Sequence, residues 1–244
     1  MRVKAVIEYH GGMFEGFQRQ KHTANTVTTA IETALRSLGI ETAIVGSGRT
    51  DAGVHASNQV IHFDLPPFWS DLRKLRTHLN ARLTYIRFKH LTPVSDDFHA
   101  RFDAQVRIYR YLFTRREPSV FEAPFVTHIT VENMRALSRA LRRFEGTHDF
   151  GFFKKTGSET ADDIRTVYRT RLERIGRYQA VYFEADGFLR AQVRMMLQAA
   201  FDVADGRLTP GQLDEQLTLH RRHTTRLAPP QGLYLARVIY GVRI

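Results

Sequence analysis

The chain has 244 residues, of which 43% are hydrophobic and 25% charged, as expected for a globular protein with a sizeable core. It carries 36 basic and 25 acidic residues, a net charge of +11, and no cysteine, which excludes disulfides, zinc–thiolate sites, iron–sulfur clusters and cysteine nucleophiles. No apolar run approaches the ~18 residues of a membrane span, and the first residues lack a signal-peptide core, so we expect a cytoplasmic protein.

Arginine supplies most of the basic charge, with 30 arginines and only six lysines. Guanidinium groups bind phosphate through two parallel hydrogen bonds and stack on bases, which ammonium groups do less well. This charge balance favours a nucleic acid as partner. Arginine used only for solubility is the alternative explanation.

The first half of the chain shows strand and helix patterns in the order β-α-β-β-α-β. The helix expected at residues 26–38 places Val27, Ile31 and Leu35 on one face and stops at Gly39. The elements expected in this half are strands at 3–10, 41–45, 59–64 and 85–91 and helices at 26–38 and 70–83.

The second half repeats this pattern. Its expected elements are strands at 107–115, 167–175, 179–185 and 233–240, helices at 131–144 and 189–204, and an extra helix at 210–220. We therefore predict an α+β fold of two ferredoxin-like (βαββαβ) halves with largely antiparallel sheets flanking a central basic cleft. The predicted domains are residues 1–103 and 104–244.

One segment concentrates the chemistry of the first domain: GSGRTDAGVHA at residues 46–56, which sets Asp51 among small residues and near Arg49. Glycines let the backbone turn tightly and approach a ligand closely. The segment lacks the lysine of a phosphate-binding P-loop, a nucleophile elbow, a second nearby acid and a metal-ligand spacing. On these residues alone, a turn capped by Asp51 and a working carboxylate both remain open.

Residues 48–56 resemble the active-site motif of TruA-type tRNA pseudouridine synthases, and further motifs of that family follow in order over essentially the whole chain. They are EYHG at 8–11, GFQRQ at 16–20, Asn80, DFHARF at 97–102, YRY at 109–111, GTHDF at 146–150, Phe188, VR at 193–194 and PPQGLYL at 229–235. Several motifs that agree in order identify a family better than any one of them.

The resemblance implies a cofactor-free, metal-free isomerisation of uridine to pseudouridine in the anticodon stem-loop of tRNA, at positions 38–40. Asp51 would be the catalytic nucleophile, attacking either the ribose C1′ or the uracil C6. Arg49 would fill the stack that the flipped base leaves, and Tyr109 would stack on the uracil. Arg194 would keep the catalytic carboxylate ionised. The family also implies a homodimer that holds one tRNA.

Each of these residues has a structural alternative. Tyr109 occupies an alternating strand position typical of a core tyrosine, and Arg194 can belong to a solvated helix face. His55, His99 and His148 are expected to be ordinary hydrogen-bonding residues. For the whole chain, the alternatives are an RNA-binding paralogue with little or no isomerase activity and a glycosidase that releases free uracil.

Four positions depart from the family pattern: Thr28, Gln192, Gln198 and Ala204. All four lie in expected helices, three of them in the helix at 189–204. Since the segment around Asp51 is intact, we expect these departures to affect substrate fit or packing and to leave the reaction unchanged.

Overall fold

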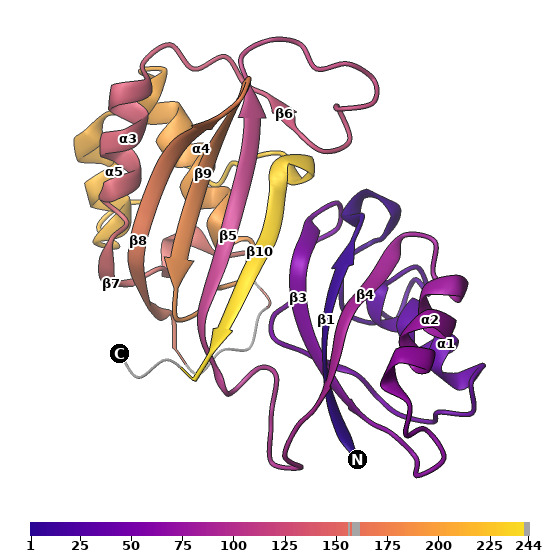
Figure 1. Ribbon diagram of the computed structural model, residues 1–244. Coiled ribbons are helices and arrows are strands. Elements are labelled where there is room, and N and C mark those ends of the chain that lie inside the picture. Colours follow the sequence, from indigo (N-terminus) through magenta and orange to yellow (C-terminus); the bar gives the residue numbers. More distant parts are fainter. Residues whose placement is uncertain (156, 158–161, 242–244) are drawn as a thin grey trace. The chain divides into compact units, whose positions relative to one another are not determined.

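The structure is a computed structural model that describes residues 1–155, 157 and 162–241. The chain divides into two compact units (Figure 1): the first combines Met1–Gln105 with the chain from Tyr234 onward, and the second is Val106–Leu233. Most strand pairs are antiparallel, which agrees with the predicted α+β class. The final strand, placed in the second domain from the sequence, groups with the first unit.

The first unit is a small sheet with two helices. Its antiparallel strands lie in the order β4-β1-β3-β2, and β10 pairs with β3 in parallel. Its elements are β1 (Arg2–Tyr9), α1 (Val27–Arg36), β2 (Val45–Gly46), β3 (His55–Asp64), α2 (Leu72–Arg82), β4 (Ile86–Pro93) and β10 (Leu233–Tyr240), with a 3-10 turn at Gly11–Met13.

Strand β1 shows why this sheet has one covered face. Val3, Ala5 and Ile7 are fully buried and alternate with partly exposed residues, the period-two pattern of a strand with one side on a core. Ile31 and Leu35 of α1 and Leu75 and Leu79 of α2 have no exposed surface. These apolar residues form the core of the first unit.

The second unit is a sheet in the order β5-β9-β8-β7 with three helices. A short strand, β6, pairs with β5 in parallel. Its elements are β5 (Ala104–Thr114), β6 (Thr127–His128), α3 (Met134–Arg142), β7 (Gly146–Asp149), β8 (Ile164–Ile175), β9 (Tyr178–Ala185), α4 (Gln192–Ala204) and α5 (Pro210–Leu217).

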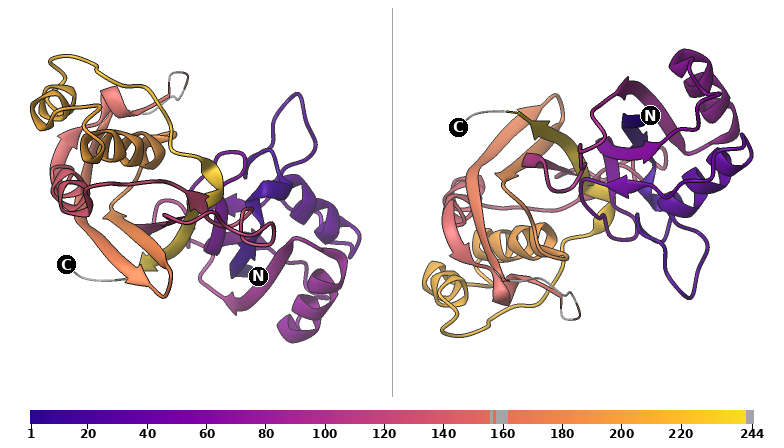
Figure 2. Two further views of the ribbon diagram at one scale, coloured as in Figure 1. Left: turned by 90° about the horizontal axis from the view of Figure 1, so that it is seen from above. Right: turned by 90° about the horizontal axis from the view of Figure 1, so that it is seen from below.

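Helix α4 is the centre of the second unit's core. Figure 2 shows it on one side of the sheet, and Phe201 in α4 packs against the rings of Tyr111 and Phe113 in β5, with centroid distances of 6.0 and 5.3 Å. Tyr109 precedes these two residues at the same alternating positions of β5. The side of β5 that faces α4 therefore carries Tyr109, Tyr111 and Phe113.

The strand expected at residues 41–45 is wrong for most of its length, because only Val45 and Gly46 pair with β3. The backbone N–H of Ile44 donates to the side-chain Oε1 of Glu32 at 3.1 Å, a side chain on α1 that is 4% exposed. This hydrogen bond replaces a strand ladder. The short strands β6 and β7 were missed.

Helix ends differ from the predicted ends where a cap decides them. Asn133 accepts a hydrogen bond from the Ala136 N–H, so α3 begins at Met134, not at residue 131. Ala191 adopts a left-handed backbone conformation, φ 61°, so α4 begins at Gln192, not at residue 189. No helix among the described residues is long and apolar enough to cross a membrane.

Candidate active site

Residues 47–54, here called the Asp51 loop, connect β2 to β3 in the first unit. The loop ends in a turn in which the Val54 N–H donates to the Asp51 carbonyl at 3.1 Å. Gly53 occupies the third position of this turn with φ +78°. A type II turn requires that conformation there, and glycine adopts it without strain. Gly53 thus has a defined role in placing Asp51.

A buried amide from β3 fixes the start of the loop. Gln59 has no exposed surface; its Oε1 accepts from the Ser47 hydroxyl at 2.6 Å, and its Nε2 donates to the Gly48 carbonyl at 2.9 Å. The Ser47 N–H also donates to the Val60 carbonyl at 2.8 Å. Three hydrogen bonds therefore hold the two residues before Arg49 against β3.

Thr50, between Arg49 and Asp51, is fixed from the other side. Its side chain shares a 2.8 Å hydrogen bond with the Tyr9 hydroxyl, and its carbonyl accepts from the Phe17 N–H at 3.1 Å. Thr28, one of the departures from the family pattern, donates its hydroxyl to the Phe17 carbonyl at 2.7 Å. The segment GFQRQ at 16–20 therefore supports the loop through backbone contacts.

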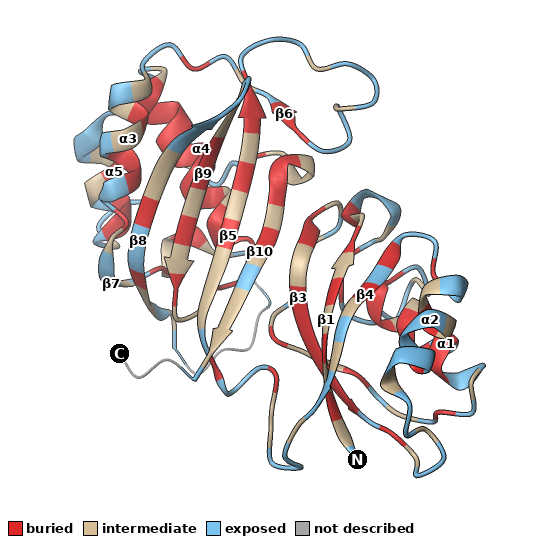
Figure 3. Cartoon of the chain, in the orientation of Figure 1, coloured by how far each residue is buried: buried red, intermediate tan, exposed pale blue. Residues whose placement is uncertain are grey.

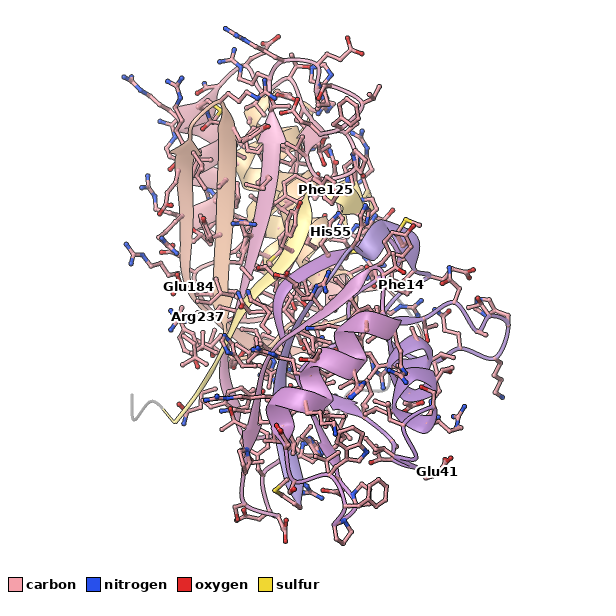
Figure 4. All side chains as sticks on the ribbon, turned by 45° about the vertical axis from the view of Figure 1, so that its right-hand side comes forward. Phe14, Glu41, His55, Phe125, Glu184 and Arg237 are labelled. Atoms are coloured by element: carbon pink, nitrogen blue, oxygen red, sulfur yellow. The ribbon has the colours of Figure 1, made fainter. Side chains whose placement is uncertain are left out.

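The end of the loop packs on the turn after β1. A Cβ atom at Gly11 would lie 2.0 Å from the Val54 carbonyl oxygen, so only glycine fits there. The Gly11 N–H donates to Nδ1 of His55 at 3.0 Å, and the His55 ring stacks on Tyr234 with centroids 4.7 Å apart. Figure 4 labels His55 at the start of β3. Because Nδ1 accepts a hydrogen bond, the neutral ring carries its proton on Nε2.

Within this frame, Asp51 is half-buried and Arg49 is exposed, while Thr50 between them is buried. A Cβ atom at Gly46 would lie 2.5 Å from the Phe17 ring, whereas one at Gly48 would meet nothing within 4 Å. Close packing therefore explains glycine at position 46 and leaves position 48 open. The loop presents a carboxylate and a guanidinium from a backbone fixed on both sides.

Tyr109 lies on β5 of the second unit and is 8% exposed. Its ring meets the edge of Phe188 with centroids 5.2 Å apart and planes at 87°. Tyr109 is thus packed as tightly as the core-tyrosine alternative requires. That packing also fixes the plane of its ring, which a stacking role would need.

Arg194 lies in the first turn of α4 and is half-buried, so a solvated helix face does not describe it. Its Nε donates to the Ala228 carbonyl at 2.7 Å, and its own carbonyl accepts from the Ala228 N–H at 3.0 Å. Burial raises the pKa of Tyr111, while a hydrogen bond to Thr127 and the charge of Arg194 oppose that rise. Arg194 therefore lies on the face of the sheet that α4 covers, where its charge affects the Tyr111 hydroxyl.

The four predicted site residues fall into two pairs: Arg49 and Asp51 share a loop of the first unit, and Tyr109 and Arg194 share the α4 side of the second unit. Sequence reasoning missed the residues that fix the Asp51 loop. No local pattern marks Gln59 in the sequence, because its strand also carries the polar residues Ser57, Asn58 and His62. Within the described parts of the chain, no three histidine or carboxylate side chains are grouped to hold a metal.

Two of the α4 residues that depart from the family pattern make hydrogen bonds inside the second unit. Gln192 has no exposed surface, and its Oε1 accepts from the Leu189 N–H at 2.7 Å. Gln198 is buried and donates to the Asp202 carboxylate at 3.0 Å. Gln192 therefore stabilises the N-terminal turn of α4, and Gln198 stabilises the middle of the helix.

Comparison with protein families gives a match to the model described as "tRNA pseudouridine synthase", over residues 5–103 and 140–241. Arg49 and Asp51 lie in the first matched region and Arg194 in the second. Tyr109 lies in the segment between the two regions.

Curated relatives match over nearly the full chain. A protein named "tRNA pseudouridine synthase A" from Wolinella succinogenes is 38% identical over 97% of this chain and 93% of its own length. Proteins of the same name from Helicobacter hepaticus and Campylobacter jejuni subsp. jejuni are 40% and 33% identical, over 97% and 98% of this chain and 98% and 100% of their lengths. A solved structure titled "Crystal Structure of a Cbf5-Nop10-Gar1 Complex" aligns over 80% of this chain and 44% of that chain. The likeness is weak, with a TM-score of 0.34 and 13% sequence identity.

Proposed function

The chain belongs to the tRNA pseudouridine synthase family, and we propose that Asp51 is the nucleophile of the reaction. The activity of this family, and of this chain, is the isomerisation of uridine to pseudouridine in tRNA. The observation that supports the role of Asp51 most strongly is the Asp51 loop itself, in which one half-buried carboxylate stands on a backbone fixed by three neighbouring segments.

The reaction needs no net change in atoms. The bond between uracil N1 and ribose C1′ breaks, the uracil rotates, and a bond forms between C5 and C1′. The proton on C5 leaves, and N1 gains a proton. A carboxylate nucleophile divides this exchange into two easier steps through a covalent intermediate. Attack at C1′ and attack at C6 both fit a single carboxylate.

Preorganisation is the structural reason to assign this step to Asp51. A nucleophile displaced by about 1 Å can lose on the order of a hundredfold in rate. The hydrogen bonds of Gln59 and Thr50 hold the residues before Asp51, and the turn at Gly53 holds the residues after it. A solvated capping turn would not require contacts from so many segments.

The neighbours of the carboxylate receive roles from the same family resemblance. Arg49 is exposed, and its flat cation suits the space in the helix that a flipped uridine leaves. Tyr109 offers a ring held by Phe188 for stacking on the flipped uracil, and its hydroxyl can relay a proton.

Arg194 is proposed to keep the catalytic carboxylate ionised, because a nearby positive charge lowers the pKa of an aspartate. The double hydrogen bond between Arg194 and Ala228 supports this role, since it holds both the backbone and the Nε of the arginine.

We further propose that the chain has two ferredoxin-like halves that flank a basic cleft, that it acts as a homodimer in the cytoplasm, and that its targets are uridines 38–40 of tRNA. The antiparallel order β4-β1-β3-β2 of the first unit is the strand order of a ferredoxin-like half, which supports the first of these features. The net charge of +11 supports binding to RNA.

The test is a product analysis. We expect unmodified tRNA incubated with the protein to gain pseudouridine, detected by chemical labelling because the isomerisation does not change mass. Asp51→Asn should bind tRNA and give no product. Free uracil in the supernatant would indicate a glycosidase, and tight binding with no product from the unmodified chain would indicate an RNA-binding paralogue.

A further inference from the structure

The connection between β5 and β6, residues 115–126, is here called the β5–β6 loop. Two adjacent apolar side chains stand on it, Val120 with 80% and Phe121 with 85% of its surface exposed. Figure 3 shows most of this loop in the colour of exposed residues, and Figure 4 labels Phe125 near its end. The loop lies between the two regions that the family model matches.

The exposed pair sits on an ordered turn. The N–H and hydroxyl of Ser119 donate to the Glu122 carboxylate at 3.1 and 2.8 Å, and the Ser119 carbonyl accepts from the Glu122 and Ala123 N–H groups, both at 2.9 Å. These bonds close the backbone around Val120 and Phe121.

Glu122 also attaches the turn to the sheet. Its carboxylate accepts a hydrogen bond from the hydroxyl of Tyr178, the first residue of β9, and forms an ion pair with Arg177 in the turn just before it. Because Glu122 is held on both sides, the loop cannot easily fold its apolar tip back onto the protein. A soluble protein that exposes adjacent large apolar side chains from a fixed turn commonly uses them for binding.

The surroundings of the tip are basic. In the β5–β9 register Phe113 lies opposite Gln179, so the start of the loop lies beside the β8–β9 turn. Four exposed arginines belong to these two neighbouring segments: Arg115, Arg116, Arg174 and Arg177. The acids of the loop are Glu117 and Glu122, and Glu122 already binds Ser119, Tyr178 and Arg177. Three of the four arginines lie outside that ion pair, so basic charge still exceeds acidic charge around the tip. Apolar rings beside guanidinium groups are the usual composition of a surface that stacks on bases and contacts phosphates.

A second copy of the chain fits this tip less well. A stable interface buries about 800 Å² on each partner, whereas a large aromatic side chain contributes about 150–250 Å². A symmetric contact centred on the tip would also bring the same arginines of two copies together. Charge and area both favour a polyanion.

We infer that Phe121 stacks on an exposed base of tRNA, with Val120 beside it and the neighbouring arginines on phosphates. This contact rests on the proposed function, since that supplies tRNA as the substrate. Arg115 follows Tyr109 by six positions of an extended strand, about 20 Å at ~3.3 Å per residue. The contact is therefore remote from the reacting uridine and contributes to affinity, while the chemical step depends on other residues.

The experiment measures Kd for unmodified full-length tRNA by fluorescence anisotropy, together with kcat and KM. Phe121→Ala should weaken binding about tenfold and raise KM, with kcat unchanged, as expected for the loss of one stacked base. Phe121→Tyr, which keeps a flat ring, should bind as the unmodified protein does, and Phe121→Leu should bind as weakly as Phe121→Ala. Phe68, 68% exposed in the first unit, provides the control, and Phe68→Ala should leave Kd unchanged.

Three results would overturn the inference: an unchanged Kd for Phe121→Ala, a Phe121→Leu variant that binds fully, or a Phe121→Ala variant whose sedimentation shows loss of a dimer. The last result would identify a second copy as the occupant. If the unmodified protein makes no pseudouridine but Phe121→Ala still weakens tRNA binding, the proposed function fails and the contact stands.

Discussion

The Asp51 loop and the β5–β6 loop are both fixed by hydrogen bonds to one polar side chain, but the first presents charged side chains and the second presents apolar ones. In each, one polar side chain binds the loop backbone or its neighbours: Gln59 for the first and Glu122 for the second. The Asp51 loop is further enclosed by the turn after β1 and by Phe17, whereas Val120 and Phe121 project into solvent.

The difference indicates how much placement each task requires. A nucleophile must reach one atom, so small displacements of its backbone cost rate. A stacking ring tolerates displacement within the plane of a base, so its loop needs order without enclosure. Disturbing the first loop should therefore lower kcat, and disturbing the second should weaken binding.

The largest effect is expected from Gly11→Ala, which places a Cβ atom 2.0 Å from the Val54 carbonyl and must displace the end of the Asp51 loop. We expect kcat to fall by about a hundredfold or more. Gly48→Ala is the matched control within the loop, since its Cβ meets nothing within 4 Å, and it should remain close to full activity. Equal losses in the two variants would show that the loop's enclosure is not what matters.

Arg194→Gln tests the charge proposed to act on the carboxylate. Removal of a positive charge raises the pKa of a neighbouring aspartate, so the acid limb of the kcat/KM profile should move to higher pH. Arg194→Lys keeps the charge and should move the limb less. Arg190→Gln, at an exposed position just before α4, is the control. An acid limb at the same pH in Arg194→Gln would remove this role.

The two polar side chains that hold the loops can be compared directly. Gln59→Ala leaves the Ser47 hydroxyl and the Gly48 carbonyl without their hydrogen bonds, and an unmade buried hydrogen bond costs about 1–3 kcal/mol. We expect about a tenfold lower kcat with little change in Kd. Glu122→Ala should weaken tRNA binding a few-fold and leave kcat unchanged. Weaker tRNA binding in Gln59→Ala together with a lower kcat in Glu122→Ala would contradict the assignment of catalysis to the Asp51 loop and of binding to the β5–β6 loop.

The smallest effect concerns the stability of the fold and neither catalysis nor binding. Burial, and then the charge of Arg2, lower the pKa of His62, whose Nδ1 accepts from the Ala100 N–H at 3.0 Å. The unfolded chain therefore binds the proton more readily, and stability should fall as pH drops below about 6.5. Urea unfolding at pH 7.5 and 5.5 should show a smaller difference in His62→Gln. The same difference in both proteins would exclude His62 as the cause.

Local patterns predicted most of the fold. The periodicity of Val27, Ile31 and Leu35 marked α1 correctly, and the strand expected at residues 3–10 corresponds to β1. The errors came from contacts that no local pattern encodes. Glu32 takes the N–H of Ile44 from across the first unit, and the left-handed Ala191 sets the start of α4.

The candidate site was found from motif order, whereas its support was not. Asp51 stands out in the sequence because small residues surround it. Tyr9 and Gln59 contact the Asp51 loop from positions 41 and 12 residues away, and neither is distinctive in its own strand. Phe121 could not be selected from the sequence, because its exposure depends on the turn that Glu122 holds.

The central claim is that Asp51 forms the bond that begins the isomerisation. Its most direct test is the single-turnover rate of pseudouridine formation with excess enzyme over unmodified tRNA, measured for the unmodified protein and for Asp51→Asn at matched saturation. We predict that the variant binds tRNA with the same Kd and is slower by at least about a thousandfold, as for the loss of a catalytic nucleophile. Pseudouridine formed by Asp51→Asn at the rate of the unmodified protein would contradict the claim.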